Sequence, residues 1–257
     1  MNNVNQVCLV SPLHDPEGRI TEIFKKYSSE LLRLYNGYVA INITETTSPE
    51  TLEAIKKTKI KFSIQDKKNV KNIGDNYKKA LSLGFGFPSS HFHLMDFDRA
   101  LHWAKRFPKE LKKVIEKMPS YEGLLSFIRT TQAFESHPFI QRSTEIVTNA
   151  LASKVVGFDV DIMSGSFGLD KNLANLVLKN SKENGVGIYA EILKIAIRNE
   201  IPIKTIIVEG LEWETPDQYQ NEIEKDGYIT WLEKFESLTE WKRRASLIEE
   251  STKVLIS

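Results

Sequence analysis

Two carboxylates separated by a single residue stand directly after a short apolar run. Asp96 and Asp98 follow residues 91–95, HFHLM, which have the length and composition of a buried strand. In an extended segment, residues i and i+2 lie on the same face, so both carboxylates can converge on one cation. Oxygen ligands suit magnesium or manganese, which complete their shells with water and substrate phosphates. The pair therefore predicts a divalent cation that neutralises a diphosphate leaving group.

The same pair has a simpler interpretation, in which it is only the solvated end of a strand. Asp98 would then cap the following helix and pair with Arg99 or Arg106. A second Asp-X-Asp triplet, at residues 159–161, shows how readily the pattern occurs. What distinguishes the first triplet is its context, because a loop and a helix precede its strand.

Histidines near the acidic pair offer further ligands. His91, His93 and His102 flank the pair, which raises the alternative of zinc-dependent hydrolysis. The chain lacks H-E-x-x-H or a comparable pair with metal-binding spacing. His91 and His93 also share one strand face, so both point away from the site if the acidic pair points into it. We expect His137, in the segment ESHPFIQR, to be the histidine that returns a nitrogen ligand to the metal.

Apolar runs that alternate with amphipathic stretches predict an α/β framework around this pair. We expect strands over residues 6–11, 38–44, 60–64, 91–95 and 203–208. Helices are expected over about 20–35, 75–83, 99–118, 144–154, 173–178, 188–197 and 228–255, and Ser48 and Pro49 predict the start of another. Residues 158–163 are interpreted as strand-like, 164–170 as a glycine-broken loop, and 120–139 as helix mixed with irregular structure.

The segment 74–99, GDNYKKALSLGFGFPSSHFHLMDFDR, resembles glycosyltransferases of the GT-A fold. In that family a helix containing glycine, Asn and Ala precedes a strand that ends in Asp-X-Asp, and the matching residues here are Gly74, Asn76, Ala80, Gly84, Asp96 and Asp98. The resemblance implies a GT-A-like three-layer sandwich with a mainly parallel central sheet and a C-terminal helical extension. It also implies a glycosyltransferase that uses a nucleotide-diphospho-sugar donor, whose diphosphate is held by magnesium or manganese on the acidic pair.

The resemblance further implies which residues contact the nucleotide. They follow the first three strands, and they are Pro12, His14, Asp15, Glu45 and Asp66. Turn chemistry explains the segment PLHDPEG equally well. By charge alone, Arg99 next to the acidic pair, or Arg129 or Arg142, could clamp a diphosphate or an acidic acceptor.

The second half of the chain provides candidates for a general base. Residues 185–210 resemble the part of GT-A enzymes in which a glycine and an acidic residue open a helix before an edge strand, which makes Glu191 a candidate. Inverting enzymes of this fold need a carboxylate to remove the acceptor proton. Asp161 and Asp170 compete for this role. A glutamate one turn into an amphipathic helix is also commonly an exposed structural residue.

Length and charge narrow the remaining choices. The 257 residues include 35 basic and 34 acidic side chains, so no bulk charge attracts nucleic acid or an anionic membrane. We expect a single domain over 1–257, with a nucleotide-binding half to about 100, an acceptor half to about 212 and a helical tail to 257. The single cysteine, the absence of a signal-peptide pattern and the lack of a long apolar run predict a cytoplasmic protein without a membrane span. Its acceptor would be a small molecule or a lipid-linked sugar carrier.

Two other functions are compatible with this framework. A nucleotidyltransferase of similar fold should have a glycine-rich loop and a basic residue after its first strand, where this chain has SPLHDPEGR with one glycine. A nucleotide-sugar-binding protein without turnover stays open, because the residues alone do not identify the base.

Overall fold

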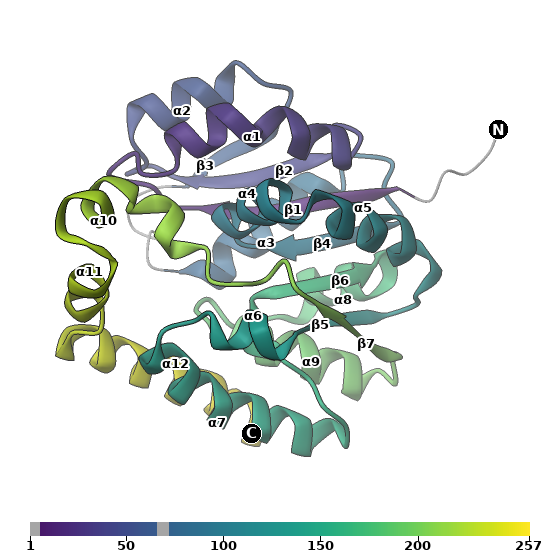
Figure 1. Cartoon of the computed structure of the whole chain (residues 1–257). Helices are drawn as coiled ribbons and strands as arrows, with labels where there is room; N and C mark the ends of the chain where they lie inside the picture. Colours follow the sequence, from purple (N-terminus) through teal and green to yellow (C-terminus); the bar gives the residue numbers. More distant parts are fainter. Residues whose placement is uncertain (1–5, 66–71) are drawn as a thin grey trace.

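A seven-stranded sheet runs through the computed structural model, which describes residues 6–65 and 72–257. Figure 1 shows the sheet between two layers of helices. In order across the sheet, the strands are β3 (Lys61–Gln65), β2 (Val39–Thr44), β1 (Val7–Leu13), β4 (His91–Met95), β6 (Ser166–Asp170), β5 (Leu124–Arg129) and β7 (Ile203–Val208). The predicted α/β sandwich with a mainly parallel central sheet is confirmed.

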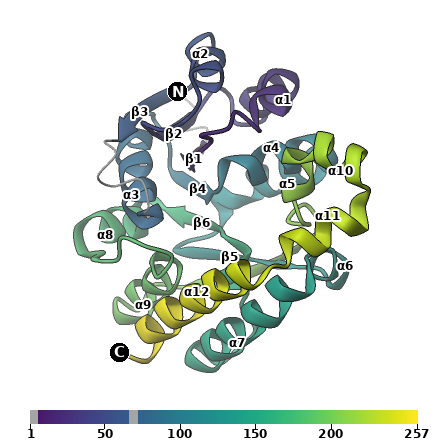
Figure 2. The ribbon, with the colours of Figure 1, turned by 90° about the vertical axis from the view of Figure 1, so that its left-hand side faces the viewer.

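Helices cover both faces of this sheet. They are α1 (Thr21–Leu34), α2 (Pro49–Lys56), α3 (Ile73–Gly84), α4 (Phe97–Arg106), α5 (Pro108–Lys117), α6 (Thr131–Glu135), α7 (Phe139–Val156), α8 (Lys171–Asn180), α9 (Ile188–Arg198), α10 (Gln220–Asp226), α11 (Tyr228–Phe235) and α12 (Leu238–Ile256). One apolar core lies between the sheet and α1, α2, α4 and α5, and a second lies between the sheet and α3, α8 and α9. The C-terminal helix α12 packs beside α7 and α9 (Figure 2). None of the described helices combines the length and apolarity that a bilayer crossing requires.

Strand direction decides which residues meet at the site. The strands β1 to β4 are parallel, and β5 and β7 run the same way, whereas β6 is antiparallel to both of its neighbours. The carboxyl ends of all strands except β6 therefore lie at one edge. Register pairs Met95 with Ser166 and His91 with Asp170. The start of β6 thus lies beside the end of β4, and the end of β6 lies at the opposite edge.

The middle of the chain differs from the prediction. The strand β5 occupies the stretch expected to mix helix with irregular structure, and β6 occupies the expected glycine-broken loop. Within β6, Gly168 serves close packing, because a Cβ there would lie 3.1 Å from the Leu125 Cβ and 3.2 Å from the Met118 sulfur. Residues 158–161 form no strand, and the 3-10 helix Ile162–Ser164 follows them. Apolar runs this short do not distinguish a buried strand from a helix by periodicity.

Local signals were more reliable at helix ends. Ser48 is the N-cap of α2, as predicted, and its hydroxyl accepts a hydrogen bond from the Thr51 backbone N–H, while Pro49 is the first helical residue. The helix α7 ends at Gly157, which has a left-handed backbone with φ +87°. These positions depend on neighbouring residues only, so the sequence predicts them directly.

Candidate active site

The acidic pair lies where β4 passes into α4, at the carboxyl edge of the sheet. Asp96 is the N-cap of α4 with an extended backbone, and Asp98 lies in the first turn of that helix. The predicted extended triplet is therefore wrong, because strand alternation stops where the helix begins at Phe97. The alternative in which Asp98 caps the helix is also wrong, since Asp96 occupies that position and makes no capping hydrogen bond.

Asp98 is partly buried among like charges. Its Oδ2 accepts a hydrogen bond from Gln218 Nε2 at 2.7 Å, and its Oδ1 accepts one from the Arg99 backbone N–H at 2.8 Å. Burial, together with the negative charges of Glu214 and Asp96, raises the pKa of Asp98 to about 7. Burial also raises the pKa of Asp96, although the Arg99 charge acts in the opposite direction. Negative charge is therefore concentrated here at a cost in desolvation.

A single guanidinium faces this charge. Arg99 is buried, and its NH2 lies 3.5 Å from Glu214 Oε1 while its NH1 donates to the Ser164 carbonyl. The Glu214 Oε2 atom is buried and has no hydrogen-bond partner among the described residues. Arg99 is thus held within the protein, which does not fit an open phosphate clamp. Within the described part of the chain, the charges of Asp96, Asp98 and Glu214 all act on Arg99.

The donor set fits magnesium or manganese. The carboxylates of Asp96 and Asp98 offer hard oxygen ligands in a region of concentrated negative charge. Within the described ranges, no three His, Cys, Asp or Glu side chains form a group that could hold an ion. An ion here would therefore complete its shell with water and substrate phosphate, which is usual for Mg²⁺.

His137 does not join the acidic pair in such a group. It lies in the turn between α6 and α7, where Nδ1 is 2.9 Å from the Ala133 carbonyl and Nε2 is 3.3 Å from Arg129 NH1. Burial and the Arg129 charge lower the pKa of this imidazole well below its usual value. Both ring nitrogens have partners within the protein, and a metal-binding role for His137 stays a prediction.

Residues expected to contact the nucleotide follow β1 and β2. Pro12 is a buried residue of β1, and His14 Nδ1 lies 2.8 Å from Thr44 Oγ1. The Asp15 carboxylate accepts hydrogen bonds from the Arg19 backbone N–H at 2.7 Å and from Thr51 Oγ1 at 2.7 Å. The Asp15 contacts match the turn chemistry that was the alternative interpretation.

Two further nucleotide candidates lie near β2 and β3. Glu45 is exposed directly after β2, and its backbone N–H donates to the Gln65 carbonyl at 3.0 Å. Asp66 lies outside the described residues.

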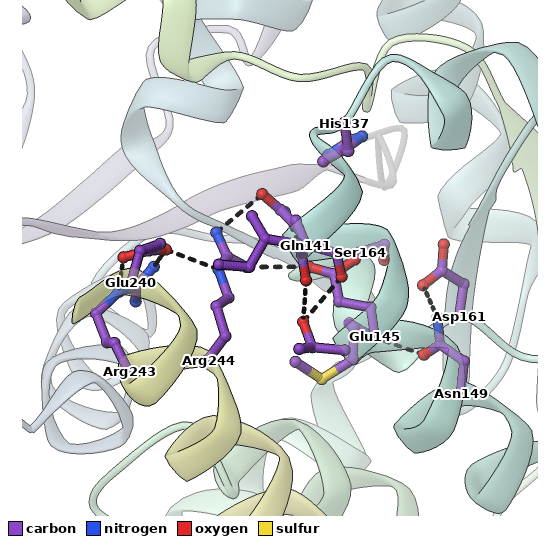
Figure 3. A network of polar contacts seen from close by, with 12 residues as sticks. His137, Gln141, Glu145, Asn149, Asp161, Ser164, Glu240, Arg243 and Arg244 are labelled. Carbon is purple, nitrogen blue, oxygen red and sulfur yellow. Dashed lines mark hydrogen bonds and ion pairs between the residues drawn. The ribbon is translucent and has the colours of Figure 1, made fainter. Parts of the chain in front are cut away.

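The first general-base candidate, Asp161, belongs to a buried ionic network. Its two oxygens accept hydrogen bonds from Arg129 at 2.7 and 2.8 Å, and Asn149 donates to Oδ1 at 2.7 Å. Figure 3 shows Asp161 beside Asn149, with Glu145 and Arg244 in the same network. Arg129 also pairs with Glu145 at 2.7 Å. The carboxylate of Asp161 is thus taken up by structural contacts.

The other two base candidates also have structural partners. Asp170 caps α8 by accepting from the Leu173 N–H at 2.7 Å, and it lies at the edge of the sheet opposite to Asp96. The antiparallel direction of β6 explains this placement, which the sequence did not predict. Glu191 accepts from Ser181 Oγ at 2.5 Å and from the Lys182 N–H at 2.9 Å. A base role for either residue stays a prediction.

Several residues of the site were not identified from the sequence. Tyr77 Oη donates to Asp96 Oδ1 at 2.7 Å, and Tyr189 Oη donates to Tyr77 Oη at 3.4 Å. Glu214 and Gln218 reach the site from the segment that follows β7. The signal that could have found these two is their position after the carboxyl end of a strand, the edge where open α/β sheets bind ligands.

Comparison with known proteins identifies the fold. No protein-family profile and no curated protein sequence matches the chain. Among solved structures, glucosyl-3-phosphoglycerate synthase of M. tuberculosis is similar, with 13% identity and a TM-score of 0.52, over 90% of this chain and 80% of the synthase. The same synthase in complex with phosphoglyceric acid gives 11% identity and a TM-score of 0.52, over 80% of this chain and 71% of that one. A further mycobacterial protein gives 12% identity and a TM-score of 0.53, over 80% and 66% of the two chains. The chain therefore has the GT-A-like fold that its residues 74–99 resemble.

Proposed function

We propose that this chain transfers a sugar from a nucleotide-diphospho-sugar donor to a small-molecule or lipid-linked acceptor, with Mg²⁺ or Mn²⁺ bound to Asp96 and Asp98. The observation that carries the proposal is the gathering of carboxylates at the carboxyl edge of β4, where the charges of Asp96, Asp98 and Glu214 all act on Arg99 within the described part of the chain. In a GT-A-like fold this edge is the expected place for a diphosphate.

The residues would act mainly through charge. A divalent ion, when bound, would neutralise the developing charge of the diphosphate leaving group. Asp96 and Asp98 would hold the ion, and Arg99 would keep Asp96, Asp98 and Glu214 together in its absence. Gly165 lies beside this group, since a Cβ there would be 3.6 Å from Asp96 Oδ2 and 3.4 Å from Arg99 NH1.

The residues proposed to contact the nucleotide and the acceptor are assigned from their positions in the fold. Pro12 lies near the end of β1, and His14 and Glu45 directly follow β1 and β2, where the base and ribose would lie; these contacts stay predictions. The acceptor base stays a prediction as well. Of its three candidates, Asp161 is the first to test, because it directly precedes the 3-10 helix whose Ser164 carbonyl contacts Arg99.

The proposal is tested by binding and then by turnover. Calorimetry with uridine, guanosine and adenosine diphosphates in the presence of Mn²⁺ should reveal binding that requires the metal. Asp98→Asn should abolish it, because an amide gives the ion a neutral ligand in place of a charged one. The matched control is Asp159→Asn, in the second Asp-X-Asp triplet, which is exposed and should bind as the unsubstituted chain does. Unchanged binding by Asp98→Asn would contradict the proposal.

One specific observation favours a second candidate. Each carboxylate considered as general base already has structural partners, which is compatible with a nucleotide-sugar-binding protein that lacks turnover. Incubation of the chain with nucleotide sugars and Mn²⁺ separates the two functions. Transfer or hydrolysis supports the glycosyltransferase, and binding without either supports the binding protein. Pyrophosphate-dependent chemistry would instead indicate a nucleotidyltransferase.

A further inference from the structure

The start of α3 and the loop before α9 come together at backbone distance. The Asn184 carbonyl accepts hydrogen bonds from the Gly74 N–H at 2.7 Å and from the Asp75 N–H at 3.2 Å. A Cβ on Gly74 would lie 2.8 Å from the Gly185 carbonyl oxygen, which is closer than real Cβ contacts allow. Glycine is therefore needed at residue 74 for the two segments to approach.

The contact between the start of α3 and the loop before α9 brings two tyrosines together about one turn later in each segment. Tyr77 follows Gly74 by three residues and Tyr189 follows Gly185 by four, so each side chain lies about one turn beyond the contact. Their rings meet edge to face, with centroids 5.8 Å apart and planes at 70°. Both are buried, at 1% and 5% exposure. They reach the site from the second apolar core.

The two hydroxyls form a chain that ends on the acidic pair. Tyr189 Oη donates to Tyr77 Oη at 3.4 Å, and Tyr77 Oη donates to Asp96 Oδ1 at 2.7 Å. Oδ1 is thereby occupied by a neutral donor. The other oxygen, Oδ2, lies on the side of Gly165, whose backbone is left-handed (φ +66°) and where a Cβ would be 3.6 Å from Oδ2 and 3.4 Å from Arg99 NH1.

We propose that Tyr77 is a positioning residue for the cation site, and that Tyr189 in turn orients Tyr77. The hydrogen bond fixes the rotation of the Asp96 carboxylate, so that Oδ2 is presented to the ion before the ion arrives. Groups that orient a metal ligand in this way change metal affinity by about 10- to 100-fold when they are removed. The inference rests on the proposed function, because it assigns Asp96 to the metal.

The test measures Mn²⁺ binding without any substrate. Free Mn²⁺ is followed by electron paramagnetic resonance during titration of the unsubstituted chain and of its variants. Tyr77→Phe removes one hydroxyl and keeps the ring, and we expect it to weaken Mn²⁺ binding by about tenfold. The matched control is Tyr35→Phe, because Tyr35 is equally buried and its hydroxyl lies 2.7 Å from His93 Nδ1, away from the acidic pair. Tyr35→Phe should leave Mn²⁺ affinity unchanged.

A double-mutant cycle separates positioning from packing. If Tyr189 acts through Tyr77, then Tyr189→Phe should weaken Mn²⁺ binding less than Tyr77→Phe does, and adding it to Tyr77→Phe should change nothing further. Melting temperatures of Tyr77→Phe and Tyr35→Phe should be similar, so that a loss of affinity in only one of them does not reflect general destabilisation. If Tyr77→Phe does not fold, Tyr189→Phe decides, and unchanged affinity in that variant overturns the inference.

The failure of the inference is distinct from the failure of the proposed function. Two results together would overturn the positioning role but support the metal site. The Mn²⁺ affinity of Tyr77→Phe would be within about twofold of that of the unsubstituted chain, and Asp98→Asn would lose Mn²⁺ binding. Absence of Mn²⁺ binding in the unsubstituted chain overturns both.

Discussion

Replacing Arg129 with methionine should destabilise the fold by about 3 to 5 kcal/mol, because Asp161 would stay buried without its cation and Glu145 would lose the closer of its two. The Arg129 side chain is fully buried, and the side chains of Glu145 and Asp161 are 3% and 8% exposed. Arg129 contacts Asp161 through two hydrogen bonds and Glu145 through a third. Asn149 and Gln141 remain as uncharged donors in the variant, and Arg244 remains 3.4 Å from Glu145.

Urea unfolding followed by circular dichroism measures this loss directly. For a chain of this length, 1 kcal/mol corresponds to about 2 to 4 °C, so the melting temperature should fall by about 6 to 20 °C. The control comes from the same network (Figure 3): Arg243 pairs with Glu240 but is 53% exposed. Arg243→Met should cost at most about 1 kcal/mol, as exposed pairs do.

Neutralising the partners sharpens the test. Combining Arg129→Met with Glu145→Gln and Asp161→Asn removes the uncompensated charges, so stability should recover in part. The reasoning is refuted if Arg129→Met alone lies within about 1 kcal/mol of the unsubstituted chain, or if the triple variant is less stable than Arg129→Met.

Three further substitutions test other parts of the fold. Because the pKa of Asp98 is raised to about 7, the stabilisation from its protonated form is complete below about pH 4 and is lost as pH rises through 7. The melting temperature of Asp98→Asn should therefore rise relative to that of the unsubstituted chain from pH 5 to pH 8. A difference in melting temperature that stays constant over this range contradicts the prediction. Burial lowers the pKa of His93 to about 3, so the stabilisation from its neutral form is present above about pH 6.5 and is lost as pH falls towards 3. His93→Gln should therefore lose less stability between pH 6.5 and pH 3 than the unsubstituted chain does, as followed by circular dichroism. An equal loss of stability in both proteins contradicts the prediction. Gly123→Ala should lower the free energy of unfolding in urea by more than about 1 kcal/mol, because φ is +79° and a Cβ would collide with the Pro202 carbonyl. Gly157→Ala should lower it less, because no atom lies within 4 Å of a Cβ at that position.

Elements with strong local signals were predictable from the sequence. The strands β4 and β7 have the predicted bounds, because short apolar runs are flanked there by polar residues and turns. The strands β5 and β6 were missed because their recognition depends on partners. β6 contains Gly168, and a glycine in a short apolar run indicates a loop when the sequence is considered alone. In the structure, a side chain at this position would be crowded by the neighbouring strand.

The residues of the candidate site also differ in how well the sequence predicts them. Asp96 and Asp98 were found because they are adjacent in sequence and follow a recognisable strand. Tyr189 and Glu214 lie more than 90 residues further along the chain, and only the strand order and the antiparallel direction of β6 bring their elements to the end of β4. Asp170 was misplaced for the same reason, since one reversed strand moves it to the far edge.

The two buried ionic clusters of this chain differ in a way that bears on function. Around Arg129, Glu145 and Asp161 each lie 2.7 Å from that arginine, and Arg244, 3.4 Å from Glu145, also pairs with Glu240. Around Arg99, the nearest carboxylate contact among the described residues is 3.5 Å, to Glu214, and the pKa of Asp98 is raised. Unpaired buried charge costs stability, so a cluster that served only the fold should pair its charges closely, as Arg129 does with Glu145 and Asp161. The loosely paired carboxylates of the second cluster therefore support the proposal of a cation site beside Asp96 and Asp98.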